Sequence, residues 1–425
     1  MAEALAAPGR GAKRCFRPSG CACRFRVPVF RASIPFRPNP FHSWRDKVIV
    51  FKAPQDKVLS VLQSIAGIVE RRHTLPILAN VLLRKTGNTL QLTTSDLEVQ
   101  IRTSADLGGD SAVDFSTSIG ARKLIEILRT FSADQTVTLE ASQDRFVLKG
   151  GKSRFTLQSL PANDFPLVQE SPNYGPAFSV PQAVLKNLLS QVSFAMAVQD
   201  IRYYLNGILF VAEGRTLSLV ATDGHRLAFA SATLDADVPK QEVILPRKTV
   251  MELQRLLRDV KPSDDKEAPA AMIQFQFANN QAKLSFNGLE FVTKLVEGKF
   301  PDYNRVIPVG YTNTVTLGRQ ALQASLQRMT IMTTDKFKGV RLNFEPGVLR
   351  ISSVNAEQEE AQDELEIDYG GQQVESGFNV SYLLDVLSNM QQDMVNLSFE
   401  DGSSSALISI PGDANFKYVV MPMRI

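Results

Sequence analysis

The residues best placed to do chemistry in this chain are Asp223, His225 and Arg226, which lie within one stretch of four positions. An aspartate beside a histidine could transfer a proton, and a neighbouring arginine could stabilise developing negative charge. A hydrolase or lyase that uses these three side chains is therefore one interpretation. The alternative is structural, because Asp-Gly followed by His and Arg favours a turn. The residue types alone leave both interpretations open.

Other motifs for chemistry are weaker. Residues 151–153 read Gly-Lys-Ser, like the end of a phosphate-binding loop, but Phe146 stands where the first glycine of such a loop is required. The three histidines, His42, His73 and His225, lack the spacing of a metal-binding pair. No Gly-x-Ser-x-Gly sequence marks a serine nucleophile. We therefore expect no catalytic residue, no metal site and no cofactor.

The elements that must position these residues occur three times. Each copy opens with a short strand and an amphipathic helix, at residues 51–55, 178–182 and 315–319. Apolar residues recur at helical spacing in these helices, such as Val58, Leu62 and Ile65 in the first copy and Leu322, Leu326 and Met329 in the third. A β-rich stretch follows, and a second helix begins 68, 67 and 63 positions after the start of the three copies. A repeat of this length indicates three similar domains and not a solenoid, whose repeats span about 20–50 residues.

We place the domains at residues 46–175, 176–312 and 313–425, after a separate segment at residues 1–45. Each domain is predicted to contain two helices and six or more antiparallel strands. The predicted strands include residues 77–83 in the first domain, 207–212 and 217–222 in the second, and 364–369 in the third. Because a helix must bury its apolar stripe against a sheet, the predicted fold class is α+β.

Basic residues lie off the apolar stripes of the predicted helices. Arg129 lies off the apolar stripe of the helix predicted at residues 122–131. Arg255 lies off the stripe of the helix predicted at residues 248–260. Six such helices, two in each domain, would present their basic outer faces on one side of the chain.

Composition limits the class of protein. Hydrophobic residues make up 44% of the chain, and no apolar run approaches the roughly 18–20 residues of a membrane span, so we expect no membrane partner. The cysteines Cys15, Cys21 and Cys23 all lie in the first 45 residues. The remainder can therefore form neither a disulfide nor a cysteine-based zinc site, which fits a cytoplasmic protein.

The first 45 residues are strongly basic. They hold nine of the 47 Lys and Arg residues and one of the 44 acidic residues, which leaves residues 46–425 with 38 basic and 43 acidic residues. A mildly acidic body predicts that any nucleic-acid contact is confined to one face. The basic segment could be a transit peptide, an arm that touches nucleic acid, or the product of a start site placed too far upstream. We expect translation to begin near Val48, where the folded pattern starts.

Five separated segments resemble the bacterial DNA polymerase III beta subunit, the sliding clamp. They read RRHTLPIL at residues 71–78, RYYLNG at 202–207, ATDGHRL at 221–227, FPDY at 300–303 and YVVMPMR at 418–424. The resemblance covers about residues 48–425. It implies a non-catalytic clamp of three tandem domains that closes into a ring as a head-to-tail homodimer, with antiparallel sheets outside and helices lining the inner face.

The resemblance implies that the ring encloses double-stranded DNA without reading its sequence. Phosphate contacts carry no sequence information, and a few cations give a weak, salt-sensitive attraction that permits sliding. The implied DNA-binding residues are Arg72, Arg122, Gln199, Arg202, Tyr203, Tyr204, Arg247 and Lys248. For each single arginine, a solvated helix face remains the alternative.

The resemblance also implies a peptide groove between the second and third domains. Its expected partners are the DNA polymerase III alpha subunit, the clamp loader delta subunit and other proteins with a clamp-binding motif. Met421 and Met423 would suit several peptides because methionine adapts its shape. The alternative is that residues 419–423 are simply a buried final strand. The implied groove residues are Leu205, Thr222, Gly224, His225, Arg226, Leu227, Pro301, Arg305, Val306, Asn379, Tyr382, Met421, Pro422, Met423 and Arg424.

Residues 154–157 read as a strand that could lie at a sheet edge, and an unpaired edge invites another chain. By resemblance, this edge pairs with the third domain of a second copy, and basic residues there face the acidic run at residues 357–363. A solvated acidic face is the alternative for that run. The implied dimer-interface residues are Lys123, Lys152, Arg154, Phe155, Leu157, Ile331, Met332, Glu357, Glu360 and Asp363.

Overall fold

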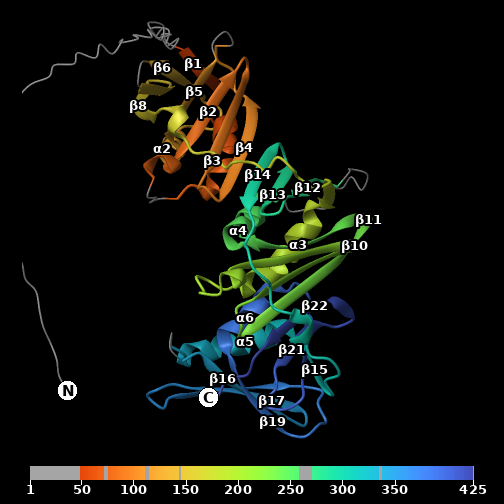
Figure 1. Ribbon diagram of the computed structural model, residues 1–425. Helices are drawn as coiled ribbons and strands as arrows, with labels where there is room; N and C mark the ends of the chain where they lie inside the picture. Colours follow the sequence, from red (N-terminus) through yellow and green to blue (C-terminus); the bar gives the residue numbers. More distant parts are fainter. Residues whose placement is uncertain are drawn as a thin grey trace, which may run out of the picture. The chain divides into compact units, whose positions relative to one another are not determined.

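A computed structural model describes residues 48–70, 75–110, 114–142, 145–257, 270–334 and 337–424 (Figure 1). The basic segment at residues 1–45 and the predicted DNA contact Arg72 lie outside these ranges. No helix within them is long and apolar enough to cross a membrane.

The first repeat packs helices α1 and α2 together against its strands. Its elements are β1 (Val48–Pro54), α1 (Gln55–Ile65), the 3-10 turns η1 (Ala66–Ile68) and η2 (Pro76–Ala79), β2 (Asn80–Thr86), β3 (Thr89–Ser95), β4 (Val99–Asp106), β5 (Phe115–Gly120), α2 (Ala121–Leu128), β6 (Thr136–Ser142), β7 (Arg145–Gly150), β8 (Ser153–Leu160) and η3 (Ala162–Asp164).

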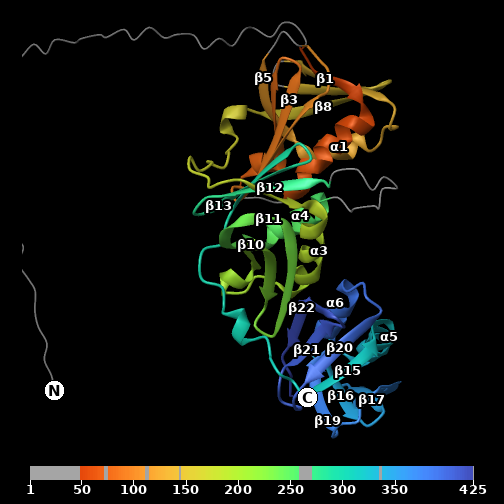
Figure 2. The ribbon, with the colours of Figure 1, turned by 90° about the vertical axis from the view of Figure 1, so that its right-hand side faces the viewer.

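The second repeat has the same order, but its middle strands are longer. Its elements are β9 (Phe178–Pro181), α3 (Gln182–Val192), η4 (Ser193–Ala195), η5 (Tyr203–Leu205), β10 (Gly207–Thr222), β11 (Arg226–Pro246), α4 (Arg247–Leu256), β12 (Met272–Phe277), β13 (Gln281–Phe286), β14 (Leu289–Lys294) and η6 (Tyr303–Arg305). Helices α3 and α4 lie side by side on one face of β10 and β11 (Figure 2).

The third repeat returns to eight strands. Its elements are β15 (Asn313–Gly318), α5 (Arg319–Met329), η7 (Thr330–Met332), β16 (Gly339–Glu345), β17 (Val348–Val354), β18 (Glu360–Glu366), β19 (Val374–Asn379), α6 (Val380–Asn389), β20 (Met394–Phe399), β21 (Ala406–Ile410) and β22 (Asp413–Val420). Leu322, Leu326 and Met329 form the buried stripe of α5, as the helical spacing predicts.

Positions in the three repeats can be matched one to one. The first helices α1, α3 and α5 each span 11 residues and run directly into a three-residue 3-10 turn. The second helices each begin one residue after an equivalent strand pair. The paired residues are Asn80 with Gly120, Gly207 with Pro246, and Gly339 with Asn379.

The sheets run across the boundaries between repeats. Strand β14, the last strand of the second repeat, pairs antiparallel with β4 of the first, and β22, the last of the third, pairs in the same way with β11 of the second. Each junction is therefore closed by main-chain hydrogen bonds. Within the described ranges, β18 pairs only with β17, and β8 pairs with β7 and, through its last two residues, with β5.

The predicted α+β class with two helices in each repeat is confirmed, but three strand predictions need correction. The sequence predicts a strand at residues 77–83, whereas Pro76 begins the turn η2 and the strand starts at Asn80. It predicts separate strands at residues 207–212 and 217–222, which are one strand because Gly214 (φ +57°) forms a bulge and not a turn. The strand predicted at residues 364–369 begins earlier, at Glu360.

Candidate functional site

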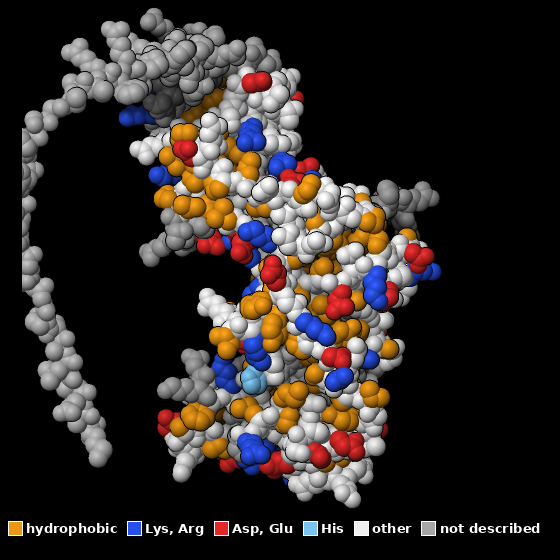
Figure 3. Space-filling view, viewed as in Figure 1, with side chains coloured by type: hydrophobic (Ala, Val, Ile, Leu, Met, Phe, Trp, Pro, Cys, Tyr) orange, Lys and Arg blue, Asp and Glu red, His pale blue; other side chains and the backbone are white. Residues whose placement is uncertain are grey.

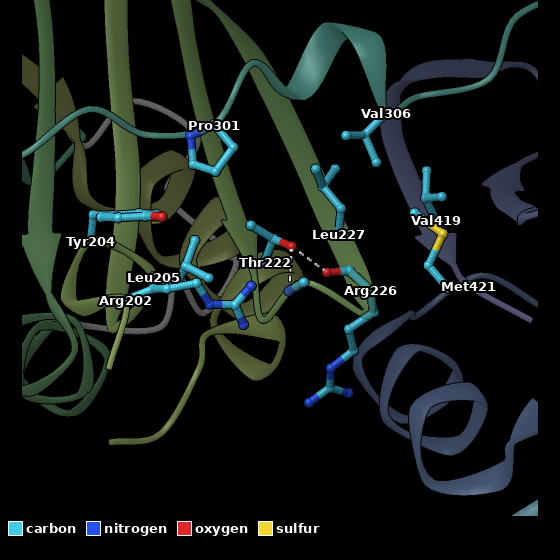
Figure 4. A pocket seen from close by; sticks show the side chains of 11 residues that line it. Arg202, Tyr204, Leu205, Thr222, Arg226, Leu227, Pro301, Val306, Val419 and Met421 are labelled. Carbon is cyan, nitrogen blue, oxygen red and sulfur yellow. Dashed lines mark hydrogen bonds between the residues drawn. The ribbon is translucent and has the colours of Figure 1, made fainter. Parts of the chain in front are cut away.

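A hollow lies at the junction between the second and third repeats (Figure 4). Its cavity volume is about 230 Å³. Its floor belongs to an apolar cluster that is separate from the main hydrophobic core and includes Leu205, Leu227, Phe300 and Val419. The hollow is lined by Arg202, Tyr204, Leu205, Thr222, Gly224, Arg226, Leu227, Pro301, Val306, Val419 and Met421.

Several elements bring these side chains together. Leu227 on β11 lies directly opposite Val419 on β22, so the strand pairing of the junction forms the apolar floor. Leu205 ends the turn η5, and its backbone N–H donates to the carbonyl of Arg202 at 2.9 Å. Pro301 and Val306 lie on either side of η6, on the segment after β14 that ends the second repeat, and face the floor from the other side (Figure 4).

Asp223 builds the turn beside the hollow. Its Oδ1 accepts the backbone N–H groups of His225 (2.9 Å) and Arg226 (3.1 Å). The first repeat repeats this arrangement, since Oδ1 of Asp96 accepts the N–H groups of Glu98 and Val99. An aspartate that makes the same turn in two repeats is a structural residue, as the turn interpretation predicts.

Arg226 joins the second and third repeats beneath the hollow. Its side chain is only 9% exposed and forms ion pairs with Asp223 (3.1 Å) and Asp385 of α6 (2.5 Å). Its Nη2 donates to the carbonyl of Phe194 at 2.6 Å, and its guanidinium lies 4.4 Å from the ring centre of Tyr382. Burial acts to lower the pKa of Arg226, but the hydrogen bond and charge of Asp385 help to outweigh that effect and raise it.

Arg202 forms one wall of the hollow. Its guanidinium donates through two nitrogens to the carboxylate of Asp200, at 3.0 and 2.8 Å, and to the carbonyl of Asp223 at 3.0 Å. The hydrogen bond from Arg202 lowers the pKa of Asp200 to about 2, so this pair stays ionised at neutral pH. The side chain passes close to Gly224, where an added Cβ would come within 2.8 Å of Nη1.

The C-terminal segment crosses the same junction. The N–H of Met421 donates to the carbonyl of His225, and that of Met423 to the carbonyl of Gly377, both at 2.9 Å. The two methionine side chains are 38% and 39% exposed although their backbone is held. Val419 is fully buried, so the buried-strand interpretation holds for this residue and ends before Met421.

Eight of the 15 groove residues that the resemblance implies line the hollow: Leu205, Thr222, Gly224, Arg226, Leu227, Pro301, Val306 and Met421. The others lie outside its lining. Asn379 caps α6, accepting the N–H of Ser381 at 3.0 Å, and Tyr382 lies beneath the hollow against Arg226. Arg305 is 86% exposed and pairs with Asp302. His225, Pro422, Met423 and Arg424 are the remainder.

Three lining residues, Arg202, Tyr204 and Val419, are absent from the predicted groove. Val419 follows from strand register, since it faces Leu227, but that register is not visible in sequence. Arg202 and Tyr204 are assigned to DNA by the resemblance. The spacing of two residues between Asp200 and Arg202 could have suggested that the arginine pairs with the aspartate of its own loop.

The described DNA-binding candidates differ in whether their charged groups already have partners within the chain. Lys248 forms ion pairs with Glu70 (2.6 Å) and with Asp96, whose side chain is 7% exposed. Arg122 donates to the carbonyl of Val69 through Nε (3.1 Å) and Nη2 (2.5 Å). On the visible face, acidic and basic side chains are intermingled and do not form one basic patch (Figure 3).

Tyr203, Arg247 and Gln199 complete the described candidates for DNA contact. Tyr203 is 56% exposed, Arg247 donates to the carbonyl of Met196 at 3.4 Å, and Gln199 adopts a positive φ of 53°. These residues lie on the loop after α3 and at the start of α4.

The interface candidates lie on or beside strands β8 and β18, except for Lys123 in α2 and Ile331 and Met332 in η7. Ile331 in η7 is 77% exposed, and β8 borders a second cavity of about 820 Å³ that Lys123 and Leu157 help to line. Asp363 on β18 already pairs with Arg328, whose hydrogen bond lowers the pKa of that carboxyl group. The other candidates, Lys152, Arg154, Phe155, Met332, Glu357 and Glu360, are all exposed or partly exposed.

One apparent chemical motif is explained by the structure. Gly151 and Lys152 form the two-residue turn between β7 and β8, with Gly151 at φ +56°, so they are a hairpin and not a phosphate-binding loop. Among the described residues, no group of three or more His, Cys, Asp or Glu side chains could hold a metal ion.

Models for the N-terminal, central and C-terminal domains of the DNA polymerase III beta subunit match residues 49–169, 179–302 and 304–424. The beta sliding clamp of Pseudomonas aeruginosa is 43% identical over 378 residues, and that of Escherichia coli is 38% identical over 375. Each alignment covers 88% of this chain and 100% of the relative.

Solved structures agree with these relatives. The Pseudomonas aeruginosa DnaN sliding clamp bound to griselimycin has a TM-score of 0.82 at 41% identity, and the Caulobacter crescentus sliding clamp has 0.79 at 33%. Each match covers 89% of this chain and 100% of the other. With all three domains matched in order, the chain belongs to the family of the bacterial DNA polymerase III beta subunit, the beta sliding clamps.

Proposed function

We propose that two copies of this chain join head to tail into a ring around double-stranded DNA and hold partner proteins by the hollow between the second and third repeats. The observation that carries the ring is the repeated strand pairing at the two internal junctions. The corresponding edges are β8 of the first repeat, which beyond β7 pairs only through its last two residues, and β18 of the third, which pairs only with β17 within the described ranges.

Beta sliding clamps are processivity factors of DNA polymerase III and are not enzymes, and this chain is one of them. The hydrolase or lyase interpretation is therefore wrong. Its physical basis is also missing, because the Asp223 carboxylate is occupied by the turn and by Arg226.

The internal junctions predict the register between subunits. In each, an aromatic residue of the last strand lies opposite an apolar residue: Phe291 opposite Ile101, and Tyr418 opposite Ala228. Phe155 is the residue of β8 that corresponds to Phe291 of β14. Phe155 lies opposite Leu148 in the hairpin of β7 and β8, just as Phe291 lies opposite Leu284 in the hairpin of β13 and β14. We place Phe155 opposite Ala361 of the partner subunit.

Charge supports this pairing. Lys152 and Arg154 are exposed at the start of β8, and the antiparallel register sets them beside Asp363 of the partner subunit and the exposed Glu364 of the partner subunit. The acidic candidates Glu357 and Glu360 are exposed at the other end of β18, beside the second half of β8. Exposed ion pairs each contribute only about 0–1 kcal/mol, so they fix the register more than the strength of the contact. The apolar side chains of Ile331 and Met332 would supply the strength.

We propose that the hollow receives an extended peptide with apolar side chains. Leu205, Leu227 and Val419 give it an apolar floor, and Met421 can adjust at its rim. The DNA polymerase III alpha subunit, the clamp loader delta subunit and other proteins with a clamp-binding motif are the proposed partners. Shared use of one small hollow would make these partners compete.

We propose that the ring touches DNA through Arg72, Arg122, Gln199, Arg202, Tyr203, Tyr204, Arg247 and Lys248, and that its domains are residues 46–175, 176–312 and 313–425. Enclosure, and not strong affinity, would keep the ring on DNA. Loosely held cations suit this role, because many tight phosphate contacts would stop sliding.

The test is retention on circular DNA. With the cognate loader present, the protein should stay on a nicked circular plasmid through gel filtration and leave once a restriction enzyme linearises it. Equal retention on both forms would mean ordinary DNA binding, and retention on neither would mean a protein scaffold without DNA.

A further inference from the structure

At the first internal junction, an arginine of the second repeat caps a helix of the first. Arg255 donates through Nη1 to the carbonyl of Gln63 (3.0 Å) and through Nη2 to that of Ser64 (3.1 Å). Both carbonyls belong to the last turn of α1, where a helix lacks internal donors, and α1 has no basic residue there. A cation at this end also interacts favourably with the helix dipole.

Arg255 is held in place by a carboxylate on its own helix. Its Nε donates to Oε2 of Glu252 at 3.0 Å, and the Glu252 side chain is only 7% exposed. Glu252 packs against Gly67 of η1, where an added Cβ would lie 2.2 Å from its oxygens. The cap and its orienting carboxylate therefore form one unit at the junction.

The same pair of residue types recurs in the first repeat. Counted from the first residue of each second helix, the sixth position is Glu126, Glu252 or Asp385, and the ninth is Arg129, Arg255 or Ser388. The Arg129 side chain is exposed and has no hydrogen-bond or ion-pair partner among the residues that the structure describes. The third repeat, with Ser388, lacks the cap.

The acceptors that match Gln63 and Ser64 lie at the end of α5, because α1 and α5 have equal lengths. They are the carbonyls of Gln327 and Arg328, and both residues are exposed. The Gln327 carbonyl accepts the Thr330 hydroxyl at 2.7 Å and keeps a second lone pair.

We infer that Arg129 caps helix α5 of the partner subunit, donating to the main-chain carbonyls of Gln327 of the partner subunit and Arg328 of the partner subunit. This inference rests on the proposed head-to-tail ring, in which β8 pairs with the partner's third repeat. The join between subunits would then be built like the first internal junction and not like the second.

One position distinguishes the two joins. Ile331 stands in η7 where Gly67 stands in η1. A branched side chain there excludes a carboxylate from the place that Glu252 occupies, so Glu126 must turn away from the contact. Arg129 lies three residues after Glu126, nearly one helical turn further, so Ile331 does not block its contact with the two carbonyls.

The test measures how readily the subunits of Arg129→Ala dissociate. The readout is the exchange of fluorescently labelled subunits between rings at decreasing protein concentration. Loss of one charged hydrogen-bond donor should weaken each contact about tenfold. A ring has two such contacts, so its dissociation constant should rise about 100-fold. Rings mixed from wild-type and variant subunits carry one altered contact and should show about a tenfold change.

Arg84→Ala is the matched control, since Arg84 is an exposed arginine on β2 of the same repeat. Arg129→Ala should not change the melting temperature in an Ile331→Ala, Met332→Ala background, because a contact between subunits cannot stabilise a monomer. Dissociation of Arg129→Ala equal to that of Arg84→Ala would overturn the inference while leaving the ring intact. A wild-type chain that is monomeric at micromolar concentration would instead overturn the ring.

Discussion

The two junctions inside the chain share one backbone arrangement and differ in what fills the hollow beside it. In both, the last strand of one repeat pairs with the strand that follows an aspartate turn in the preceding repeat. At the first junction the corresponding space belongs to a packed cluster of Leu78, Leu82 and Phe165, with Leu97 packed against it. At the second, a cavity of about 230 Å³ remains open.

A single turn position accounts for much of this difference. Leu97 (φ +77°) and Gly224 (φ +91°) occupy the same place after their aspartates, and both have the left-handed backbone that the turn requires. Leucine accepts the strained conformation and fills the space with its side chain. Glycine adopts it without strain and leaves the space to the Arg202 guanidinium and to the cavity. The proposed binding site thus lies where one side chain is omitted from a repeated contact.

The paired strands beneath the two spaces differ in the same way: the first is closed by the chain itself and the second is left open. Gln100 on β4 matches Leu227 on β11, and its Oε1 accepts the N–H of Val168 at 3.1 Å. The chain's own connecting segment is therefore fixed over the first junction by a hydrogen bond. Leu227 offers no such acceptor, so the second junction keeps an apolar floor that another chain can cover.

The largest expected effect concerns the cation that joins the second and third repeats. Arg226→Ala leaves Asp223 and the carbonyl of Phe194 without their buried donor, and should lower the free energy of unfolding by about 3 kcal/mol. Urea unfolding followed by circular dichroism measures this. Arg215→Ala on β10 removes an exposed arginine and should cost less than 1 kcal/mol; equal losses would show that Arg226 does not bridge the junction.

Copying the first junction into the second should close the groove. In Gly224→Leu, the new side chain takes the space of the Arg202 guanidinium and part of the cavity, so the affinity for a polymerase tail peptide should fall about 100-fold. Fluorescence anisotropy with a labelled peptide measures this while gel filtration checks the dimer.

Gly214→Leu is the matched control for this variant, because Gly214 has a similar positive φ (57°) and no atom within 4 Å of an added Cβ. It carries the same backbone strain without touching the groove. Unchanged peptide affinity in Gly224→Leu, or equal loss in the control, would contradict the view that one omitted side chain makes the site.

Sequence reasoning recovered the repeats because their signals are local. The helical stripe of Val58, Leu62 and Ile65 and the turn at Asp223 are determined by neighbours in the chain, and both are found where they are predicted. Strand continuity was harder to predict, since a glycine such as Gly214 can form either a turn or a bulge, and tertiary pairing decides between them.

The site was only partly predictable, for a related reason. Its floor depends on the register of Leu227 against Val419, residues that are distant in sequence. The place of Arg202 depends on a bidentate bond to Asp200 that turns a DNA candidate toward the groove. The pairing of Lys248 with Asp96 likewise brings together two residues of different repeats.

The first junction depends on Arg255, and its loss should have a moderate effect. Arg255→Ala removes two hydrogen bonds to the end of α1 and exposes the Glu252 carboxylate without its partner. We expect the free energy of unfolding to fall by about 1–2 kcal/mol. Hydrogen exchange should show faster opening of α1 amides while those of α6, at the second junction, stay unchanged. Equal acceleration in both helices would mean global destabilisation and not a junction contact.

The smallest expected effect separates junction cations from DNA cations. Lys248 is paired with Glu70 and Asp96; burial acts to lower its pKa, but these hydrogen bonds outweigh that effect and raise it. Its charge is already balanced, so Lys248→Ala should change the slope of log affinity for short duplex DNA against log salt by well under the roughly 0.9 expected for one phosphate contact. Arg247→Ala, on the adjacent residue without an ion pair among the described residues, should change the slope by close to that amount. A full unit lost from Lys248→Ala would mean that DNA displaces the carboxylates, and that this junction is sensitive to DNA in a way the second is not.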